Sequence, residues 1–246
     1  MHTLINEDRQ AHGLQPVEWD ETAAIAALQH AQEMADFGYI SHWNLDGYGP
    51  DYRYTSTGGA HVVFENVYTY EHSPGGGPTT AEEWEALIQE AQQTLMDSPG
   101  HRDNILAPEH THVAIGIDYS ESTGRLAIAQ EFVNQYMTLT PLPRSASVGQ
   151  TVQLSGWLGP RVANPLLNLA YEPFPAPRNL ADLRPEPYRS PAEVFDVPNL
   201  TVSDDGRLSA AFVLDNNAQP GLYHVWLWVE TEHGFVQAVG WVIRVS

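Results

Sequence analysis

The chain has 246 residues, of which 42% are hydrophobic, so it can bury a core in each of two domains. It has no cysteine, which excludes disulfides and thiolate chemistry, and no run of roughly 20 apolar residues that could span a bilayer. Its net charge is −20, from 31 acidic residues against 11 arginines, and this charge argues against a nucleic-acid partner.

The acidic and imidazole groups are concentrated in the first part of the sequence. Residues 1–140 contain 21 Asp and Glu against 4 Arg, whereas residues 141–246 contain 10 against 7. Nine of the 11 histidines also precede residue 140. Such a surface suits divalent cations, and the same composition also serves solubility.

The opening of the chain predicts two helices. Residues 3–12 form the first, which Gly13 ends. Asp20 caps the second. We expect this second helix to bury one face, made of Ala24, Leu28, Ala31 and Ala35 and widened by Ile25 and Met34.

A third helix and three strands are predicted between these two helices and residue 140. Thr80 and Glu83 match a capping box, and apolar residues follow at helical spacing from Trp84 to Leu95. Residues 61–70 predict a strand, and residues 111–120 and 125–136 predict a hairpin. Helices on both sides of a small, mainly antiparallel sheet would bury these faces.

A change in periodicity near residue 140 predicts a domain boundary, with one domain at 1–140 and another at 141–246. The second part contains five strand candidates and predicts an immunoglobulin-like β-sandwich, at residues 151–158, 166–171, 207–214, 221–230 and 235–245. The proline-rich stretch from Pro173 to Pro198 is expected to be a long ordered loop or an insertion with edge strands.

The fourth of these strands is apolar on both faces. Tyr223, Val225, Leu227 and Val229 alternate with His224, Trp226 and Trp228. We expect the second face to pack against another part of the protein, with an aromatic platform for glycans as the alternative.

Several segments, in this order, resemble the bacterial branch of the CAP superfamily, which includes cysteine-rich secretory proteins, antigen 5 and plant pathogenesis-related proteins. The opening at residues 6–53 looks like the family's N..R...GL and SH...DG..P..R segments. FENV at 64–67 is similar to the EN motif, SPGHRDNIL at 98–106 to the SPGHR.NIL motif, and residues 115–132 to the closing hairpin.

The resemblance implies a three-layer α-β-α sandwich with a cleft lined by His42, Glu65 and His101. These three are the candidate catalytic and metal-binding residues. Animal and plant members add a second glutamate after a helix tryptophan, but this sequence has Leu95 and Ser98 at those positions, so the tetrad is incomplete.

Read by chemistry alone, two imidazoles and a carboxylate suit zinc, with calcium or magnesium as alternatives, or a general acid and base. A buried His–Glu network that only fixes loops is the structural alternative. Ser41 and Ser98 lack a nucleophile motif. His110 and His112 could form an auxiliary metal site, but we expect them to be exposed strand-edge histidines.

Three functions follow. The favoured one is a secreted binding protein whose cleft holds a divalent cation and a small-molecule, lipid-like or cell-surface ligand, with any signal peptide already removed. The second is a metal-assisted peptidase or esterase. The third is a structural or adhesive extracellular module in which the sandwich does the binding.

Overall fold

The structure is a computed structural model that describes residues 1–73 and 75–246. Its chain forms two compact units. Unit 1 comprises residues 1–50, 63–133 and 177–188, and unit 2 comprises residues 51–62, 134–176 and 189–246. Each unit therefore contains a segment from the other half of the sequence, so the simple boundary at residue 140 stays a prediction.

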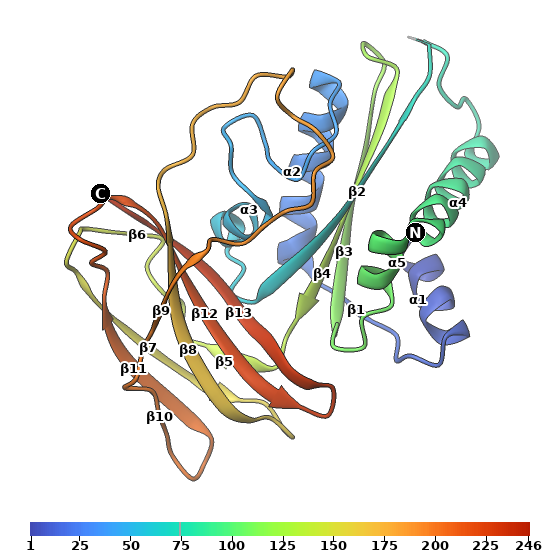
Figure 1. Cartoon of the computed structure of the whole chain (residues 1–246). Coiled ribbons are helices and arrows are strands. Elements are labelled where there is room, and N and C mark those ends of the chain that lie inside the picture. Colours follow the sequence, from blue (N-terminus) through green and yellow to red (C-terminus); the bar gives the residue numbers. More distant parts are fainter. Residues whose placement is uncertain (74) are drawn as a thin grey trace. The chain divides into compact units, whose positions relative to one another are not determined.

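Unit 1 has a mixed sheet in the strand order β1-β3-β4-β2 (Figure 1). Its strands are β1 (Glu18–Trp19), β2 (Val62–Glu71), β3 (His112–Ser120) and β4 (Arg125–Asn134). Its helices are α1 (His2–Ala11), α2 (Glu21–Phe37), α4 (Ala81–Asp97) and α5 (Pro99–Ile105). The predicted capping box is confirmed, because Thr80 and Glu83 bond each other's backbone.

Alternation along β4 separates the two helical layers. Ala127 and Ala129 pack against α2, whereas Leu126 and Ile128 pack against Leu87 and other residues of α4. Successive residues of a strand point to opposite faces, so helices cover both sides of the sheet. Unit 1 is thus the α-β-α sandwich that the sequence predicted.

The predicted buried face of α2 is wrong in part. Asp20 does cap the helix, accepting from the backbone of Thr22 and Ala23. However, Ile25 and Leu28 are 51% and 41% exposed. The buried face consists of small residues with one histidine and one methionine, namely Ala23, Ala26, Ala27, His30, Ala31, Met34 and Ala35. Small side chains allow α2 to approach the sheet closely.

Two short helices were not predicted. α3 (Pro50–Thr57) follows the loop that carries His42, and α5 begins directly after the third predicted helix. Each has fewer than nine residues, too few for hydrophobic periodicity to stand out.

Unit 2 is a two-sheet β-sandwich. One sheet has the order β10-β11-β7-β5 and the other β6-β13-β12-β8-β9. The strands of the first sheet are β5 (Met137–Leu139), β7 (Thr151–Leu158), β10 (Thr201–Val202) and β11 (Arg207–Val213). Those of the second are β6 (Ser145–Ala146), β8 (Ala163–Glu172), β9 (Glu193–Asp196), β12 (Gly221–Thr231) and β13 (Gly234–Val245). The predicted β-sandwich is therefore confirmed, and its likeness to the immunoglobulin fold stays a prediction.

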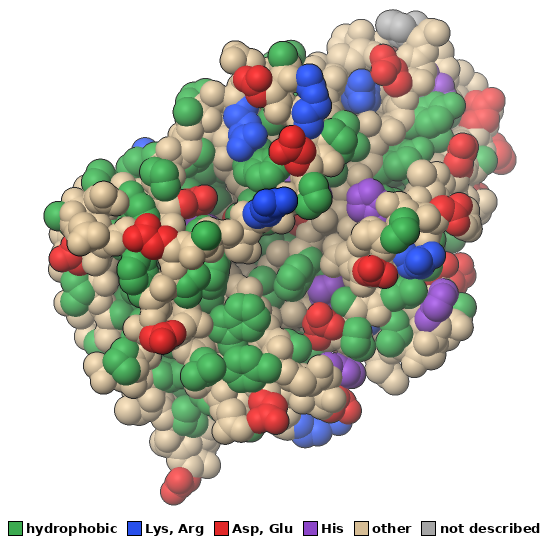
Figure 2. All heavy atoms as spheres, viewed as in Figure 1, with side chains coloured by type: hydrophobic (Ala, Val, Ile, Leu, Met, Phe, Trp, Pro, Cys, Tyr) green, Lys and Arg blue, Asp and Glu red, His purple; other side chains and the backbone are tan. Residues whose placement is uncertain are grey.

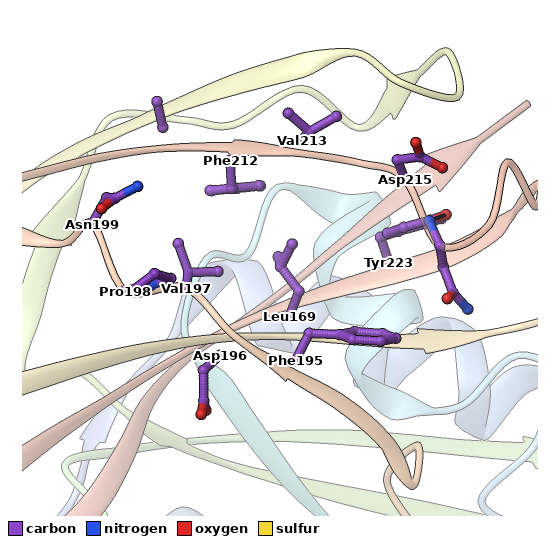
Figure 3. A pocket seen from close by; sticks show the side chains of 12 residues that line it. Leu169, Phe195, Asp196, Val197, Pro198, Asn199, Phe212, Val213, Asp215 and Tyr223 are labelled. Carbon is purple, nitrogen blue, oxygen red and sulfur yellow. Dashed lines mark hydrogen bonds between the residues drawn. The ribbon is translucent and has the colours of Figure 1, made fainter.

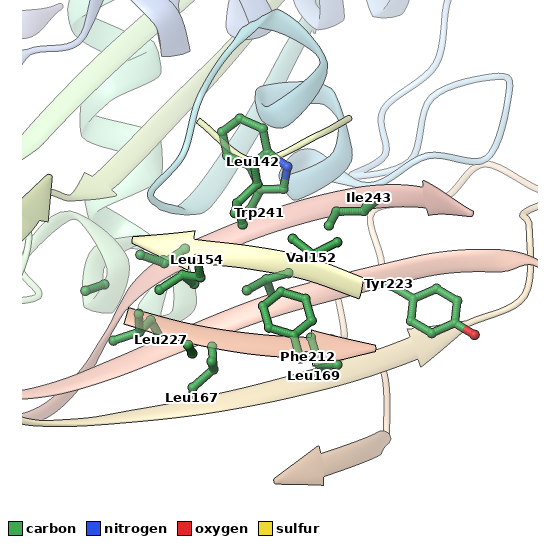
Figure 4. Close-up of a cluster of buried hydrophobic side chains, with 14 of the residues drawn as sticks. Leu142, Val152, Leu154, Leu167, Leu169, Phe212, Tyr223, Leu227, Trp241 and Ile243 are labelled. Atoms are coloured by element: carbon green, nitrogen blue, oxygen red, sulfur yellow. The ribbon is translucent and has the colours of Figure 1, made fainter. Parts of the chain in front are cut away.

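Both sheets contribute to one buried core (Figure 4). Val152 and Phe212 come from the first sheet, and Leu169, Tyr223 and Leu227 come from the second. All five predicted strands of this region are present. β9 lies within the proline-rich stretch and pairs with β8 at the edge of its sheet. The alternative of an insertion with an edge strand is therefore confirmed.

Candidate functional site

The candidate site is built around a hydrogen bond between His42 and Glu65. His42 lies in the loop after α2, and Glu65 lies on β2. His42 Nδ1 donates to Glu65 Oε1 at 2.8 Å, and the Glu65 side chain is completely buried, whereas that of His42 is 12% exposed. The carboxylate therefore fixes the orientation of an imidazole that solvent can reach.

His30 belongs to the same cluster, although the sequence analysis did not select it. Its Nε2 donates to the Ser41 carbonyl at 2.8 Å and lies 3.9 Å from Glu65 Oε2. It also holds the residue before His42 in place. No sequence pattern singled it out, because the predicted buried face of α2 did not include His30.

His101 lies on α5 and is half-buried. Burial lowers the pKa of His101, and the electrostatic interaction with His42 lowers it further, because two nearby imidazoles disfavour carrying a proton each. This imidazole is therefore neutral at pH 7, the form that can accept a proton or bind a metal ion.

Asn66, the second residue of the EN motif, connects β2 to α5. Its side chain donates to the His101 carbonyl at 3.2 Å and to Gln130 Oε1 at 3.1 Å, and it accepts from Asn104 at 3.0 Å. Gln130 in turn donates to Gln92 at 2.9 Å. A buried polar network thus holds the backbone of His101 in place next to the strand that carries Glu65.

Other motif residues near the N-terminus have structural roles. Asn6 bonds both backbone groups of Val17, and Arg9, which is fully buried, donates to the carbonyls of Ile105 and Ala107. These contacts satisfy buried backbone groups at the end of α5. These structural contacts account for Asn6 and Arg9 of the opening motif, so neither residue needs a catalytic role.

His110 is a core residue, so the expectation that it is exposed is wrong. It is 5% exposed, stacks on Phe132 and donates from Nε2 to Asn104 Oδ1 at 3.0 Å. His112 is partly buried and lies 3.5 Å from Glu18. Ser41 Oγ accepts from the Trp43 backbone at 3.1 Å, which is a turn contact.

The 177–188 segment of the proline-rich stretch completes unit 1 beside the loop that follows His42. The Arg178 backbone donates to the Leu45 carbonyl at 2.7 Å, and its guanidinium lies 4.6 Å from the Trp43 ring centre. Tyr188 contacts the same ring, with ring centres 5.7 Å apart. Leu183 is buried in the hydrophobic cluster that contains the alanines of α2. The loop is therefore fixed by residues far away in sequence.

Within residues 1–73 and 75–246, no three His, Asp or Glu side chains lie close enough together to hold a metal ion by themselves. By their chemistry, neutral imidazoles are suitable cation ligands; the pKa of His101 is lowered, and His42 has its Nδ1 engaged by Glu65. Metal ligation by His42, Glu65 and His101 stays a prediction.

Unit 2 contains a separate cavity of about 360 Å³ (Figure 3). It lies between β9 and β11, and its apolar lining includes the core residues Leu169, Phe212 and Tyr223. None of the predicted site residues lines it. The candidate site therefore remains the cluster around His42 and Glu65.

The class of protein defined by the structure is an α-β-α sandwich in which a buried glutamate holds a loop histidine, as the resemblance to the CAP superfamily implied. The sequence profile of the cysteine-rich secretory protein family (CAP) matches residues 2–137, more than half of the chain, so the chain belongs to this family.

Two relatives from Bacillus subtilis (strain 168) match over 120 residues at 32% identity. YkwD is matched over 48% of this chain and 40% of its own length. YlbC, described as a membrane protein, is matched over 47% of this chain and 30% of its own length. The chain thus spans less than half of either relative.

A solved structure of an extracellular SCP-domain protein from Bacillus anthracis is also similar. It aligns with a TM-score of 0.42 and 22% identity, over 55% of this chain and 40% of the other. In the part of the chain that the structure describes, no helix is long and apolar enough to cross a membrane.

Proposed function

We propose that the protein is an extracellular binding protein whose unit 1, the CAP unit, holds a divalent cation between His42 and His101, with zinc as the preferred ion. The observation that carries the proposal is the 2.8 Å hydrogen bond from His42 Nδ1 to the buried Glu65 carboxylate. The family's description as secretory proteins supports the extracellular location.

The tautomer of His42 follows from this bond. When Nδ1 carries the proton that Glu65 accepts, the lone pair of the neutral ring is on Nε2. Metal-binding histidines commonly use one ring nitrogen for the metal while the other donates to a carboxylate. Glu65 is thereby proposed as the residue that orients His42, with direct ligation as the alternative.

His101 would supply the second ligand. Its lowered pKa keeps it neutral, so a cation would not have to displace a proton near pH 7. Two histidines leave open positions for water or a ligand oxygen. A bound zinc ion would act as a Lewis acid toward such a group.

The test is zinc titration by calorimetry of the full chain and of the His42→Ala/His101→Ala double variant. We expect one zinc ion per chain and loss of that binding in the variant. Glu65→Gln should weaken zinc binding about 10- to 100-fold, because Gln cannot hold the ring with a charge.

The matched control is His12→Ala/His233→Ala, which removes two exposed imidazoles. This control should bind zinc like the wild type. If it loses the same binding, the acidic surface holds the ion and the proposal is wrong. If all three variants bind like the wild type but Glu65→Gln melts lower, the cluster is a structural network and the CAP unit is a scaffold.

A further inference from the structure

The outer face of the second sheet of unit 2 carries aromatic residues that the core does not use. Trp228 on β12 lies opposite Leu166 on β8 and Gln237 on β13. Glu230, two residues further along β12, lies opposite Phe235. Directly paired residues and residues two apart share a face, so these five side chains lie on the same side of the sheet.

This surface, which we call the Trp228 face, is accessible. Leu166 is 56% exposed and Phe235 is 48% exposed, and Trp228 is partly exposed. The rings of Trp228 and Phe235 are nearly parallel, with 6° between their planes and 6.4 Å between their centres. Figure 2 shows hydrophobic side chains gathered over the strands β8, β12 and β13.

Amide and carboxylate groups border the rings. Asn164 donates to Glu230 Oε2 at 2.6 Å, and Asn168 donates to Asp196 Oδ1 at 2.8 Å. Asn168 lies two residues from Leu166 and opposite Asp196, and so belongs to the same face. Each carboxylate has two oxygens and several acceptor positions, so it can accept further hydrogen bonds from a ligand.

We infer that the Trp228 face binds a neutral oligosaccharide. A pyranose ring presents an apolar C–H surface that packs against an aromatic ring, while its hydroxyl groups need donors and acceptors at the border. The two carboxylates would repel an anionic polysaccharide or a phosphate-rich surface. This site lies in unit 2 and is independent of the proposed cation site.

The experiment is calorimetric titration of the full chain with two neutral probes, the β-1,4-linked hexasaccharides of glucose and of N-acetylglucosamine, with an alginate hexasaccharide as the anionic comparison. We expect at least one neutral probe to bind and alginate not to bind. Trp228→Ala and Phe235→Leu should each weaken that binding at least tenfold.

The matched control is Trp157→Ala on β7, since Trp157 is 47% exposed and belongs to the other sheet. It should bind the neutral probe like the wild type. Phe235→Leu keeps an apolar, exposed position, so it tests the site even if Trp228→Ala does not fold.

Three outcomes would overturn the inference. They are no binding of either neutral probe, equal binding by wild type and Phe235→Leu, or binding of alginate as strong as that of the neutral sugars. A dimer in sedimentation that Phe235→Leu dissociates, without sugar binding, would assign the face to a second copy of the chain instead.

Discussion

At the scale of single residues, a buried histidine in unit 2 lies between two carboxylates. His224 Nδ1 lies 2.9 Å from Asp51 on α3, and Nε2 lies 3.1 Å from Glu172 on β8. Burial alone lowers the pKa of His224, but Asp51 and then Glu172 outweigh it and raise the pKa to about 9. The imidazolium therefore ties α3 to β8 and β12.

This pair of contacts makes the stability of unit 2 depend on pH. In the native state His224 keeps its proton up to about pH 9, whereas in the unfolded state it releases this proton near pH 6.5. The stabilisation is thus complete below pH 6.5 and lost as pH rises through about 9. It amounts to on the order of 3 kcal/mol.

Thermal unfolding between pH 6 and pH 10 tests this dependence, with His224→Gln as the comparison. The wild-type Tm should fall across this range, and the difference in Tm between wild type and variant should shrink toward pH 10. A difference that stays constant with pH would mean that His224 is neutral in the native state.

At the scale of elements, the packing of α2 on the sheet depends on a glycine. A Cβ on Gly116 of β3 would lie 2.1 Å from the backbone carbonyl carbon of Ala27. No side chain fits there, so the helix and the strand are in direct backbone contact. This close approach is the reason that alanines, and not the larger Ile25 and Leu28, form the buried face of α2.

Gly116→Ala should lower the free energy of unfolding by about 1–3 kcal/mol, since the helix must move away from the sheet. Urea denaturation measures this change. The control is Gly100→Ala in α5, where a Cβ meets nothing within 4 Å, so that this variant should be as stable as wild type or more so. Equal stability of the Gly116 variant would contradict the close packing.

At the scale of the whole molecule, each compact unit needs a segment from the other half of the sequence. Unit 2 includes most of α3, and three residues of this helix contact later parts of the chain. Asp51 contacts His224, and Thr55 accepts a hydrogen bond from the Val242 backbone at 3.2 Å. The Ser56 carbonyl accepts a hydrogen bond from Arg144 at 2.9 Å. Cutting the chain at residue 140 would therefore remove α3 and its contacts with the β-sandwich.

We predict that the fragment 141–246 unfolds at a lower temperature than unit 2 does in the intact chain. It loses β5 of the first sheet, and it loses Asp51, which leaves His224 with one carboxylate partner. A synthetic peptide of residues 50–62 should raise the Tm of the fragment in proportion to its concentration. A fragment as stable as the intact chain, indifferent to the peptide, would instead support an independent domain at 141–246.

The sequence by itself determined the order and type of most elements, the capping of two helices, the strands of the sandwich and the family motifs. These depend on local propensity and periodicity, which a chain carries without its tertiary contacts. It also selected His42 and Glu65, which the structure joins by a hydrogen bond.

Tertiary structure alone decided which face of α2 is buried, that His30 joins the Glu65 cluster, and that His110 lies in the core. It also decided that residues 51–62 and 177–188 pack with the opposite half of the sequence. These outcomes depend on close backbone approach and on contacts between residues that are far apart in the sequence, such as Asp51 and His224 or Thr55 and Val242, and no local pattern encodes such contacts.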